Sequence, residues 1–241
     1  MMVESREPRV ESQRGLREHF ESDGFLFVRA FLSAAEVQHL RDEITPLTQA
    51  KRAGVRNLLR RCPAVTEVAK SKSFIRILQE LSGGMPFAVR GIFFDKTAQA
   101  NWHVPWHQDT AIAVQQRAEV PGFNWWSVKE GAIHVHPPTE VLEQMIAVRI
   151  HLDDSDETNG ALKVIPGSHR QGKLDDDGVE EWKRRGPVVS CDAKSGEVLI
   201  MRPLLLHASS PSGFPRHRRV IHLEYAVDEL PSGLNWFDHV A

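Results

Sequence analysis

Cysteine is scarce in this chain of 241 residues, since only Cys62 and Cys191 are present. Two cysteines are too few for a disulfide framework in a chain of this length, and neither belongs to a CxxC pair. We therefore expect both to be reduced thiols in a reducing compartment, which favours a cytoplasmic location.

An excess charge of one sign and a long apolar run are missing as well. The 30 Lys and Arg residues are balanced by 32 Asp and Glu residues, for a net charge of -2. Such a chain has no global field to attract a nucleic acid or an anionic membrane surface, so neither is expected as a partner. No stretch reaches the roughly 18 apolar residues of a membrane span, and the N-terminus, MMVESREPRVESQRG, lacks the apolar region of a signal peptide. We expect a soluble protein that is not exported.

The composition is that of one globular domain, with 41% hydrophobic and 26% charged residues and no repeat, low-complexity tract or linker. The polar residues 1–14 are predicted to be a disordered N-terminus ahead of a single domain over 15–241. Its first part is typical of helices: Leu16 and Phe20 share a face, Ser33 and Glu36 fit a capping box, and two short helices are expected within 65–82, closed by Gly83.

Strands are indicated after residue 86 by short β-branched or aromatic runs between turn formers. These runs are AVRGIFFD, MIAVRIHLDD, ALKVIPG, GEVLIMRPLLLHA and RRVIHLEYAV. Because they do not alternate with helices, they favour a mainly β fold, a sandwich or open barrel with accessory helices on one side. The segments of about 110–143 and 170–187 are too long for hairpin turns, and we expect lid-like insertions there.

One of the twelve histidines occurs with an aspartate in a pattern that suits a metal ion. His107 and Asp109 follow a strand-like run, and residues i and i+2 of an extended chain project to the same side. An imidazole and a carboxylate suit Fe(II), and a second histidine would complete a facial triad. The HxD pair alone is a weak signal, because it is equally compatible with a surface pair.

His207 is the candidate third ligand. It ends the apolar run LIMRPLLLH, where a histidine can also simply cap a buried strand. Arg218 follows eleven residues later, after a Pro- and Gly-containing connection that can return the chain to the metal. A bound dicarboxylate would need such an arginine, and the hydroxyl of Ser209 can add a second hydrogen bond.

Together these residues resemble a known family. WHQD, the run NGALKVIPGSH at 159–169, HAS followed by RRVIHLEY, and the opening FESDGFLFVRAFLSAAEVQHLRDEI resemble the phytanoyl-CoA dioxygenase family of iron(II)/2-oxoglutarate oxygenases. The resemblance spans residues 16 to about 230. It implies a double-stranded β-helix, the cupin-like jelly roll, with Fe(II) bound by His107, Asp109 and His207. It also implies that Arg218, with Ser209 beside it, holds the distal carboxylate of the co-substrate 2-oxoglutarate.

The resemblance leaves several roles open. Lys96 and Arg90 are further candidates for contacting the co-substrate, and Arg216 and Arg219 compete with Arg218. Relatives that halogenate have a small residue in place of the carboxylate, so Asp109 favours oxygen insertion. We expect hydroxylation of a small organic molecule by O2 and 2-oxoglutarate, with release of succinate and CO2.

Other interpretations of the sequence compete with this one. The chain could be a cupin-like protein that binds metal and 2-oxoglutarate without turnover, or an oxygenase that desaturates, epimerises or closes rings. It could also be a zinc hydrolase, but that would need a Glu or His base beside the metal, and none is evident in the sequence. Several aromatic residues could line a pocket or merely pack: Trp102, Trp106, Phe123, Trp125 and Trp126.

The remaining histidines are expected to be structural. Pro105 argues against a helical HxxxH metal pair of His103 with His107. His134 and His136 favour a solvated strand edge over a second metal pair. Three more are expected to make structural hydrogen bonds: His151, His169 and His222.

Overall fold

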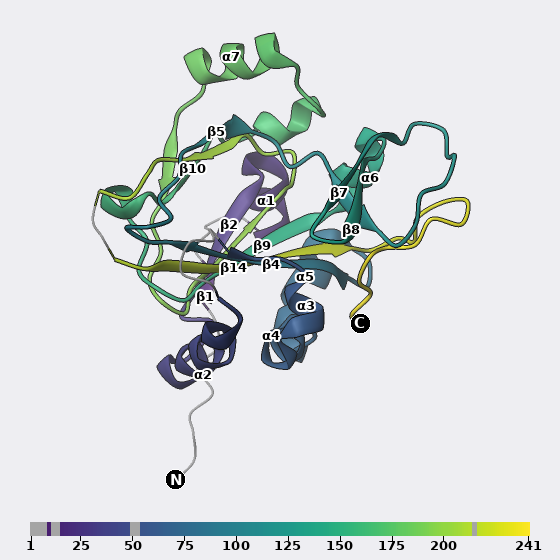
Figure 1. Cartoon of the computed structure of the whole chain (residues 1–241). Helices are drawn as coiled ribbons and strands as arrows, with labels where there is room; N and C mark the ends of the chain where they lie inside the picture. Colours follow the sequence, from purple (N-terminus) through teal and green to yellow (C-terminus); the bar gives the residue numbers. More distant parts are fainter. Residues whose placement is uncertain (1–8, 11–14, 49–53, 214–215) are drawn as a thin grey trace.

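Antiparallel sheets make up most of the fold. The computed structural model describes residues 9–10, 15–48, 54–213 and 216–241. Within these residues the large sheet has seven strands, in the order β1 (Arg9–Val10), β2 (Phe25–Arg29), β12 (Val198–Met201), β9 (Ile146–His151), β14 (Arg218–Ala226), β4 (Phe87–Lys96) and β3 (Gly54–Val55). A four-stranded sheet, β11 (Val189–Cys191), β10 (Leu162–Val164), β13 (His207–Ser209) and β5 (Val104–His107), lies opposite it (Figure 1). This is the expected jelly roll.

Helices cover the outer face of the large sheet (Figure 1). They are α2 (Ala34–Ile44), α3 (Leu58–Arg61), α4 (Pro63–Ala69) and α5 (Lys72–Ser82), preceded in the chain by α1 (Leu16–Asp23). The capping box is confirmed at α2, where the Ser33 side chain accepts from the Glu36 amide and the Glu36 carboxylate accepts from the Ser33 amide. Gly83 ends α5 with a φ of 75°, a left-handed conformation that favours glycine.

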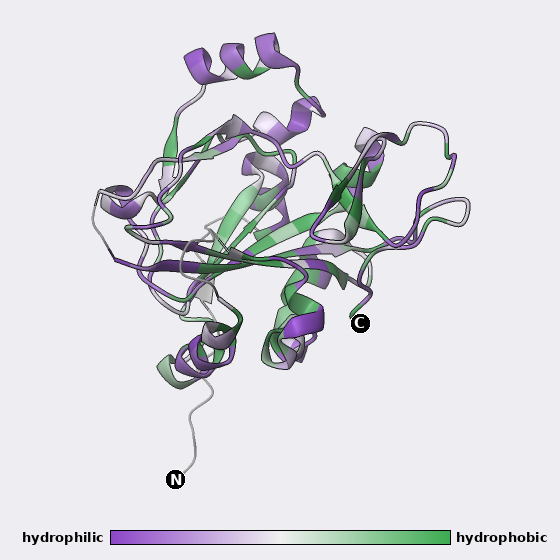
Figure 2. Cartoon of the chain, viewed as in Figure 1, coloured by the Kyte–Doolittle hydropathy of each residue, from purple (hydrophilic) through white to green (hydrophobic). Residues whose placement is uncertain are grey.

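The central strands of the large sheet are buried on both faces. In β9, Val148 and Ile150 pack against the helices in one apolar core, together with Phe74 and Leu78 of α5. The intervening Ala147 joins a second core with residues of the small sheet. Figure 2 shows the middle of the large sheet as largely hydrophobic and α7 as mostly hydrophilic. Side chains that alternate with the helix-facing residues therefore point into the space between the sheets.

The two long insertions carry secondary structure of their own. Residues 110–143 contain a three-stranded sheet of β6 (Ile112–Val114), β8 (Ala132–His136) and β7 (Asn124–Lys129), followed by α6 (Thr139–Gln144). This sheet has an apolar core that includes Val135 and Trp236. Residues 170–187 contain α7 (Asp176–Arg185), which stands away from the sheets (Figure 1).

Two further expectations concern the N-terminal residues and the two cysteines. The expected disorder at residues 1–14 does not hold at Arg9–Val10, where the backbone pairs with β2 at the open edge of the large sheet. The rest of that prediction, at 1–8 and 11–14, lies outside the described residues. Cys62 and Cys191 are free thiols, as expected, and both are buried. Within the described part of the chain, no helix is both long and apolar enough to cross a membrane.

Candidate metal centre

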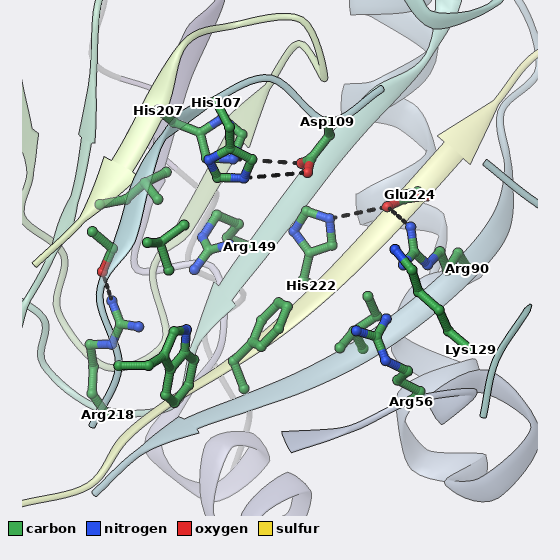
Figure 3. Close-up of a pocket in the computed structure, with 16 residues that line it drawn as sticks. Arg56, Arg90, His107, Asp109, Lys129, Arg149, His207, Arg218, His222 and Glu224 are labelled. Carbon is green, nitrogen blue, oxygen red and sulfur yellow. Dashed lines mark hydrogen bonds and ion pairs between the residues drawn. The ribbon is translucent and has the colours of Figure 1, made fainter. Parts of the chain in front are cut away.

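Pairing of two strands of the small sheet brings the three candidate ligands together. His107 of β5 lies opposite His207 of β13 in the ladder, and Asp109 follows two residues after His107. The Asp109 amide donates to the Pro203 carbonyl at 2.9 Å, which fixes the chain beyond the strand. The three side chains offer ligand atoms that all lie within 4.8 Å of one another (Figure 3). The expected proximity of His107, Asp109 and His207 is therefore present in the structure.

Hydrogen bonds orient both imidazoles toward the same point. The Nδ1 of His107 donates to the Pro105 carbonyl at 2.9 Å, and the Nδ1 of His207 donates to the Leu205 carbonyl at 2.8 Å. A carbonyl can only accept, so each ring carries its proton on Nδ1 and has a free lone pair on Nε2. These Nε2 atoms lie 3.8 and 3.7 Å from the Asp109 carboxylate oxygens. Such backbone partners are typical of histidines that bind metal ions.

The electrostatics of the three groups suit a divalent cation. Desolvation in the cavity raises the pKa of Asp109, but the nearby His207 and His222 outweigh it and hold that pKa at about 2. Burial lowers the pKa of His207 to about 4. At neutral pH the site thus presents an ionised carboxylate and a neutral imidazole, which are the protonation states a metal requires. Two imidazole nitrogens and a carboxylate oxygen form a facial set that leaves positions open on an octahedral ion.

A buried cationic subsite lies in the same cavity. The Lys96 side chain is fully buried, and its Nζ donates to Ser209 Oγ at 2.7 Å and to the Ser210 carbonyl. Arg218 Nη1 donates to the Gly160 carbonyl and, at 3.4 Å, to Ser209 Oγ. Among the described residues no carboxylate pairs with either cation, and Arg218 Nε has no hydrogen-bond partner. Burying two unneutralised cations is costly, so the subsite has the chemistry to hold an anion.

Gly160 permits this arrangement. Its φ is 77°, and a Cβ at this position would lie 2.3 Å from the Ser210 carbonyl oxygen. The Gly160 carbonyl accepts from Ser209 Oγ at 2.8 Å as well as from Arg218. Because only glycine fits so close to the neighbouring chain, the turn at Asn159 and Gly160 holds the subsite together.

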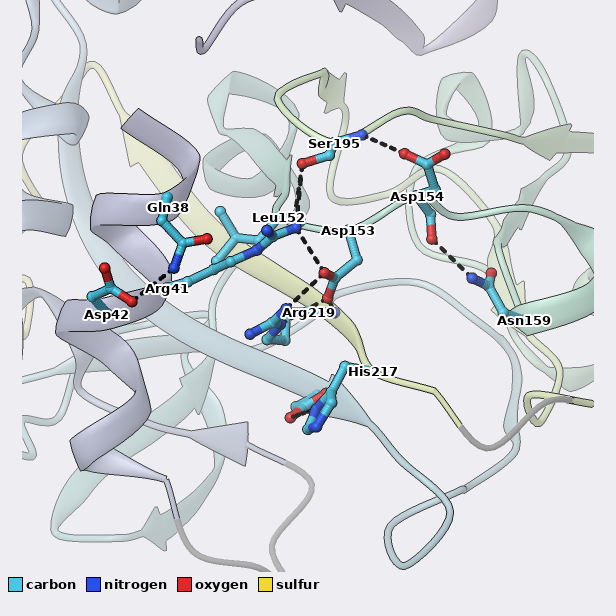
Figure 4. A network of polar contacts seen from close by, with 11 residues as sticks. Gln38, Arg41, Asp42, Leu152, Asp153, Asp154, Asn159, Ser195, His217 and Arg219 are labelled. Atoms are coloured by element: carbon cyan, nitrogen blue, oxygen red, sulfur yellow. Dashed lines mark hydrogen bonds and ion pairs between the residues drawn. The ribbon is translucent and has the colours of Figure 1, made fainter. Parts of the chain in front are cut away.

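The competing arginines point elsewhere. Arg219 binds Asp153 through Nε and Nη2, both at 2.8 Å, in a network that includes Arg41 (Figure 4). The exposed Arg216 lies 3.3 Å from Asp156. Arg218 instead lines the cavity, since alternation along β14 directs it, His222 and Glu224 to the interior side.

Three cavity residues were missed or underrated by sequence reasoning. Arg149 is a buried cation of β9 whose guanidinium lies 5.9 Å from the Phe94 ring centre, and within the described residues its Nε has no hydrogen-bond partner. Its position inside the apolar run MIAVRIHLDD is a signal that could have identified it. His222 and Glu224 also line the cavity, with His222 Nε2 3.5 Å from Glu224 Oε1, and sequence reasoning did not find this pair. Their strand offered no such signal, being buried on both faces.

The other predicted residues have mixed outcomes. Of the aromatic candidates, Trp102 lines the cavity, whereas Trp125 is 79% exposed. His103 is exposed and lies outside the ligand cluster, as expected. The prediction of a solvated strand edge is wrong for His134, which is buried on β8, the middle strand of its sheet. The prediction of a structural hydrogen bond is wrong for His151, whose ring nitrogens have no hydrogen-bond partner among the described residues.

The fold and this donor set are those of a non-haem iron, 2-oxoglutarate-dependent oxygenase. The family model for phytanoyl-CoA dioxygenase (PhyH) matches residues 20–218, and the chain belongs to this family. Fe(II) and 2-oxoglutarate, the cofactor and co-substrate expected from the sequence, are those of this class of enzyme. The search of curated proteins found no match.

Solved structures share the fold at low sequence identity. AviO1 from Streptomyces viridochromogenes Tue57 superposes with a TM-score of 0.65 at 22% identity, covering 90% of this chain and 96% of AviO1. EctD from S. alaskensis, solved with 2-oxoglutarate and 5-hydroxyectoine, has a TM-score of 0.69 at 19% identity, covering 90% and 76%. SnoK, a non-heme alpha ketoglutarate dependent carbocyclase from nogalamycin biosynthesis, has a TM-score of 0.69 at 14% identity, covering 90% and 86%.

Proposed function

We propose that this chain hydroxylates a small organic molecule, with release of succinate and CO2 from 2-oxoglutarate. His107, Asp109 and His207 hold Fe(II), and Arg218 and Ser209 hold the distal carboxylate of 2-oxoglutarate, with Lys96 as a further partner. The observation that carries the proposal is that three metal donors and an unneutralised pair of buried cations line one cavity. We also propose the cytoplasm as its compartment, since both cysteines are free thiols.

The residues of the chain bind and orient, while bound iron and 2-oxoglutarate would activate O2, which is the oxidant. Arg218 offers a planar fork that pairs with a carboxylate in bidentate fashion and stays charged. Ser209 links the two cations through its hydroxyl, which fixes both donors before a ligand arrives. Asp109 occupies the position that halogenating relatives keep free, and this supports oxygen insertion.

Two alternatives have less support. A protein that binds without turnover would have little need for the complete set of metal donors beside Arg218, and the family model that matches is that of a dioxygenase. A zinc hydrolase could use His222 and Glu224 as its base, but it would have no use for Arg218 and Lys96. Ring closure remains a competing outcome because SnoK, of similar fold, is a carbocyclase.

Succinate release separates these functions. We expect the purified chain to convert 2-oxoglutarate to succinate only when both Fe(II) and O2 are present, and more rapidly with a matching organic substrate. Mass spectrometry of the product should then show one added oxygen atom. A product two hydrogens lighter would contradict hydroxylation, and succinate formation without O2 would contradict the class of reaction. Substitution of Zn2+ for Fe(II) is the control and should give no succinate.

Binding of 2-oxoglutarate should weaken as the pH rises above neutrality. Burial lowers the pKa of Lys96 to about 7, helped by the charges of Arg218 and Arg149. A bound dianion favours the charged ammonium, so above pH 7 binding must take up a proton and affinity should fall by up to about tenfold per pH unit. The measurement is the Kd of 2-oxoglutarate in the iron-loaded protein from about pH 6 to pH 9. Lys96→Met should bind more weakly at low pH and lose the dependence; an equally steep slope in Lys96→Met would refute this role.

A further inference from the structure

A second group of cations lies at the other end of the cavity. In Figure 3 the three metal donors lie between Arg218 on one side and Arg56, Arg90 and Lys129 on the other. These three cations come from separate parts of the fold: Arg56 follows β3, Arg90 is on β4, and Lys129 ends β7 in the 110–143 insertion. The fold therefore brings three positive side chains together at a second place in the cavity. Binding of the co-substrate at Arg218 does not account for them.

The acidic residues nearby neutralise this group only in part. Glu224 pairs with Arg90 at 2.9 Å. Arg56 is 3.9 Å from Glu130, a long contact to a side chain that is 43% exposed. Among the described residues no carboxylate pairs with Lys129. Burial and the charges of Arg56 and Arg90 lower the pKa of Lys129, and burial and Arg90 lower that of Arg56. The three cations are thus close enough to repel one another, which an anion between them would relieve.

We propose that Arg56 and Lys129 bind an oxyanion, a carboxylate or a phosphate, carried by the primary substrate. Arg90, held by Glu224, completes the positive side of the site. The proposal rests on the proposed function, because it places the reacting part of the substrate between this anionic group and the metal donors. The two ends of the cavity would then bind different anions, 2-oxoglutarate at Arg218 and the substrate at Arg56.

The dimensions of the cavity favour a small substrate. Its volume is about 200 Å³, below the roughly 300–1,000 Å³ of pockets that enclose drug-sized ligands. A substrate that shares this space with 2-oxoglutarate must extend to the mouth, where the partly exposed Arg56 and the exposed Lys129 lie. Because Lys129 belongs to the insertion, the insertion contributes directly to the choice of substrate.

Three probes with the same hexyl chain test the charge requirement: heptanoate, hexyl phosphate and hexanol. Isothermal titration calorimetry is performed anaerobically on protein loaded with Fe(II) and 2-oxoglutarate, so that the Arg218 end is filled. We expect one of the two anions to bind at least about tenfold more tightly than hexanol, and Arg56→Gln/Lys129→Gln to lose this preference. Lys72→Gln/Arg76→Gln removes the same charge from exposed positions of α5, across the large sheet, and should leave the preference unchanged.

The outcomes separate this proposal from the proposed function. Equal binding of hexanol and both anions, no measurable binding of either anion, or an unchanged preference in Arg56→Gln/Lys129→Gln would overturn the oxyanion site. The same titrations on metal-free Lys96→Met/Arg218→Met do not depend on iron or on the two cations of the co-substrate subsite. If loading with Fe(II) and 2-oxoglutarate fails but this variant still prefers the anion, the proposed function is wrong and the oxyanion site stands. The preferred head group tells a carboxylate from a phosphate.

Discussion

His207→Ala is expected to lower the affinity for Fe(II) by more than about 100-fold, since losing only an outer hydrogen-bond partner of a metal ligand already costs about 10–100-fold. The imidazole is buried, is oriented by the Leu205 carbonyl, and directs its lone pair at the Asp109 carboxylate. Among the described residues the donor cluster contains only one further histidine, His107. The measurement is an anaerobic titration with Fe(II) and 2-oxoglutarate, which should give a weak visible charge-transfer band in the wild type and none in the variant.

His103→Ala is the matched control, because His103 lies four residues before His107, is exposed, and is outside the ligand cluster. Its band and iron affinity should equal those of the wild type. Asp109→Ala should abolish O2-dependent succinate release, since it removes the carboxylate that faces both imidazoles. An unchanged band in His207→Ala, or succinate release that persists in Asp109→Ala, would remove these residues from the metal site.

Local chain geometry made two of the three metal donors predictable as a pair. His107 and Asp109 are two residues apart in extended backbone, so their shared side follows from the period of a strand. His207 could not be placed this way, because its register opposite His107 depends on the pairing of β5 with β13, strands about a hundred residues apart. Only the resemblance to a family connected them. The sheet of the 110–143 insertion was likewise hidden, since its strands read as one long loop.

Burial on both faces explains what sequence reasoning could not decide. Alternation of apolar and polar residues shows the direction of a side chain only when one face of a strand meets water. The strand β14 lies between the helices and the small sheet, so apolar residues occur on both of its faces. The choice between Arg218 and Arg219 was therefore open, and His222 and Glu224 could not be assigned to the cavity. In the structure, Arg219 forms an ion pair with Asp153.

Arg218→Ala is expected to weaken 2-oxoglutarate binding by about 30-fold to several thousand-fold, because losing one partner of a buried charge pair costs about 2–5 kcal/mol and tenfold corresponds to about 1.4 kcal/mol. Iron affinity measured without 2-oxoglutarate should change far less, as Arg218 makes no contact with the metal donors among the described residues. The charge-transfer titration gives both constants. Arg219→Ala is the control; the same loss there, with Arg218→Ala unaffected, would show that the wrong arginine was assigned.

Although loss of Arg218 weakens 2-oxoglutarate binding, it should not lower the thermal stability of the ligand-free protein. Burial and the charge of Arg149 lower the pKa of Arg218 to about 9, so the free protein carries an unfavourable buried cation. Arg218→Met should therefore melt at or above the wild-type temperature without 2-oxoglutarate. Added 2-oxoglutarate should raise the Tm of iron-loaded wild type, because it binds the native state only, and should leave that of Arg218→Met almost unchanged. A variant that melts lower and is still stabilised by 2-oxoglutarate would mean that Arg218 supports the fold rather than the co-substrate.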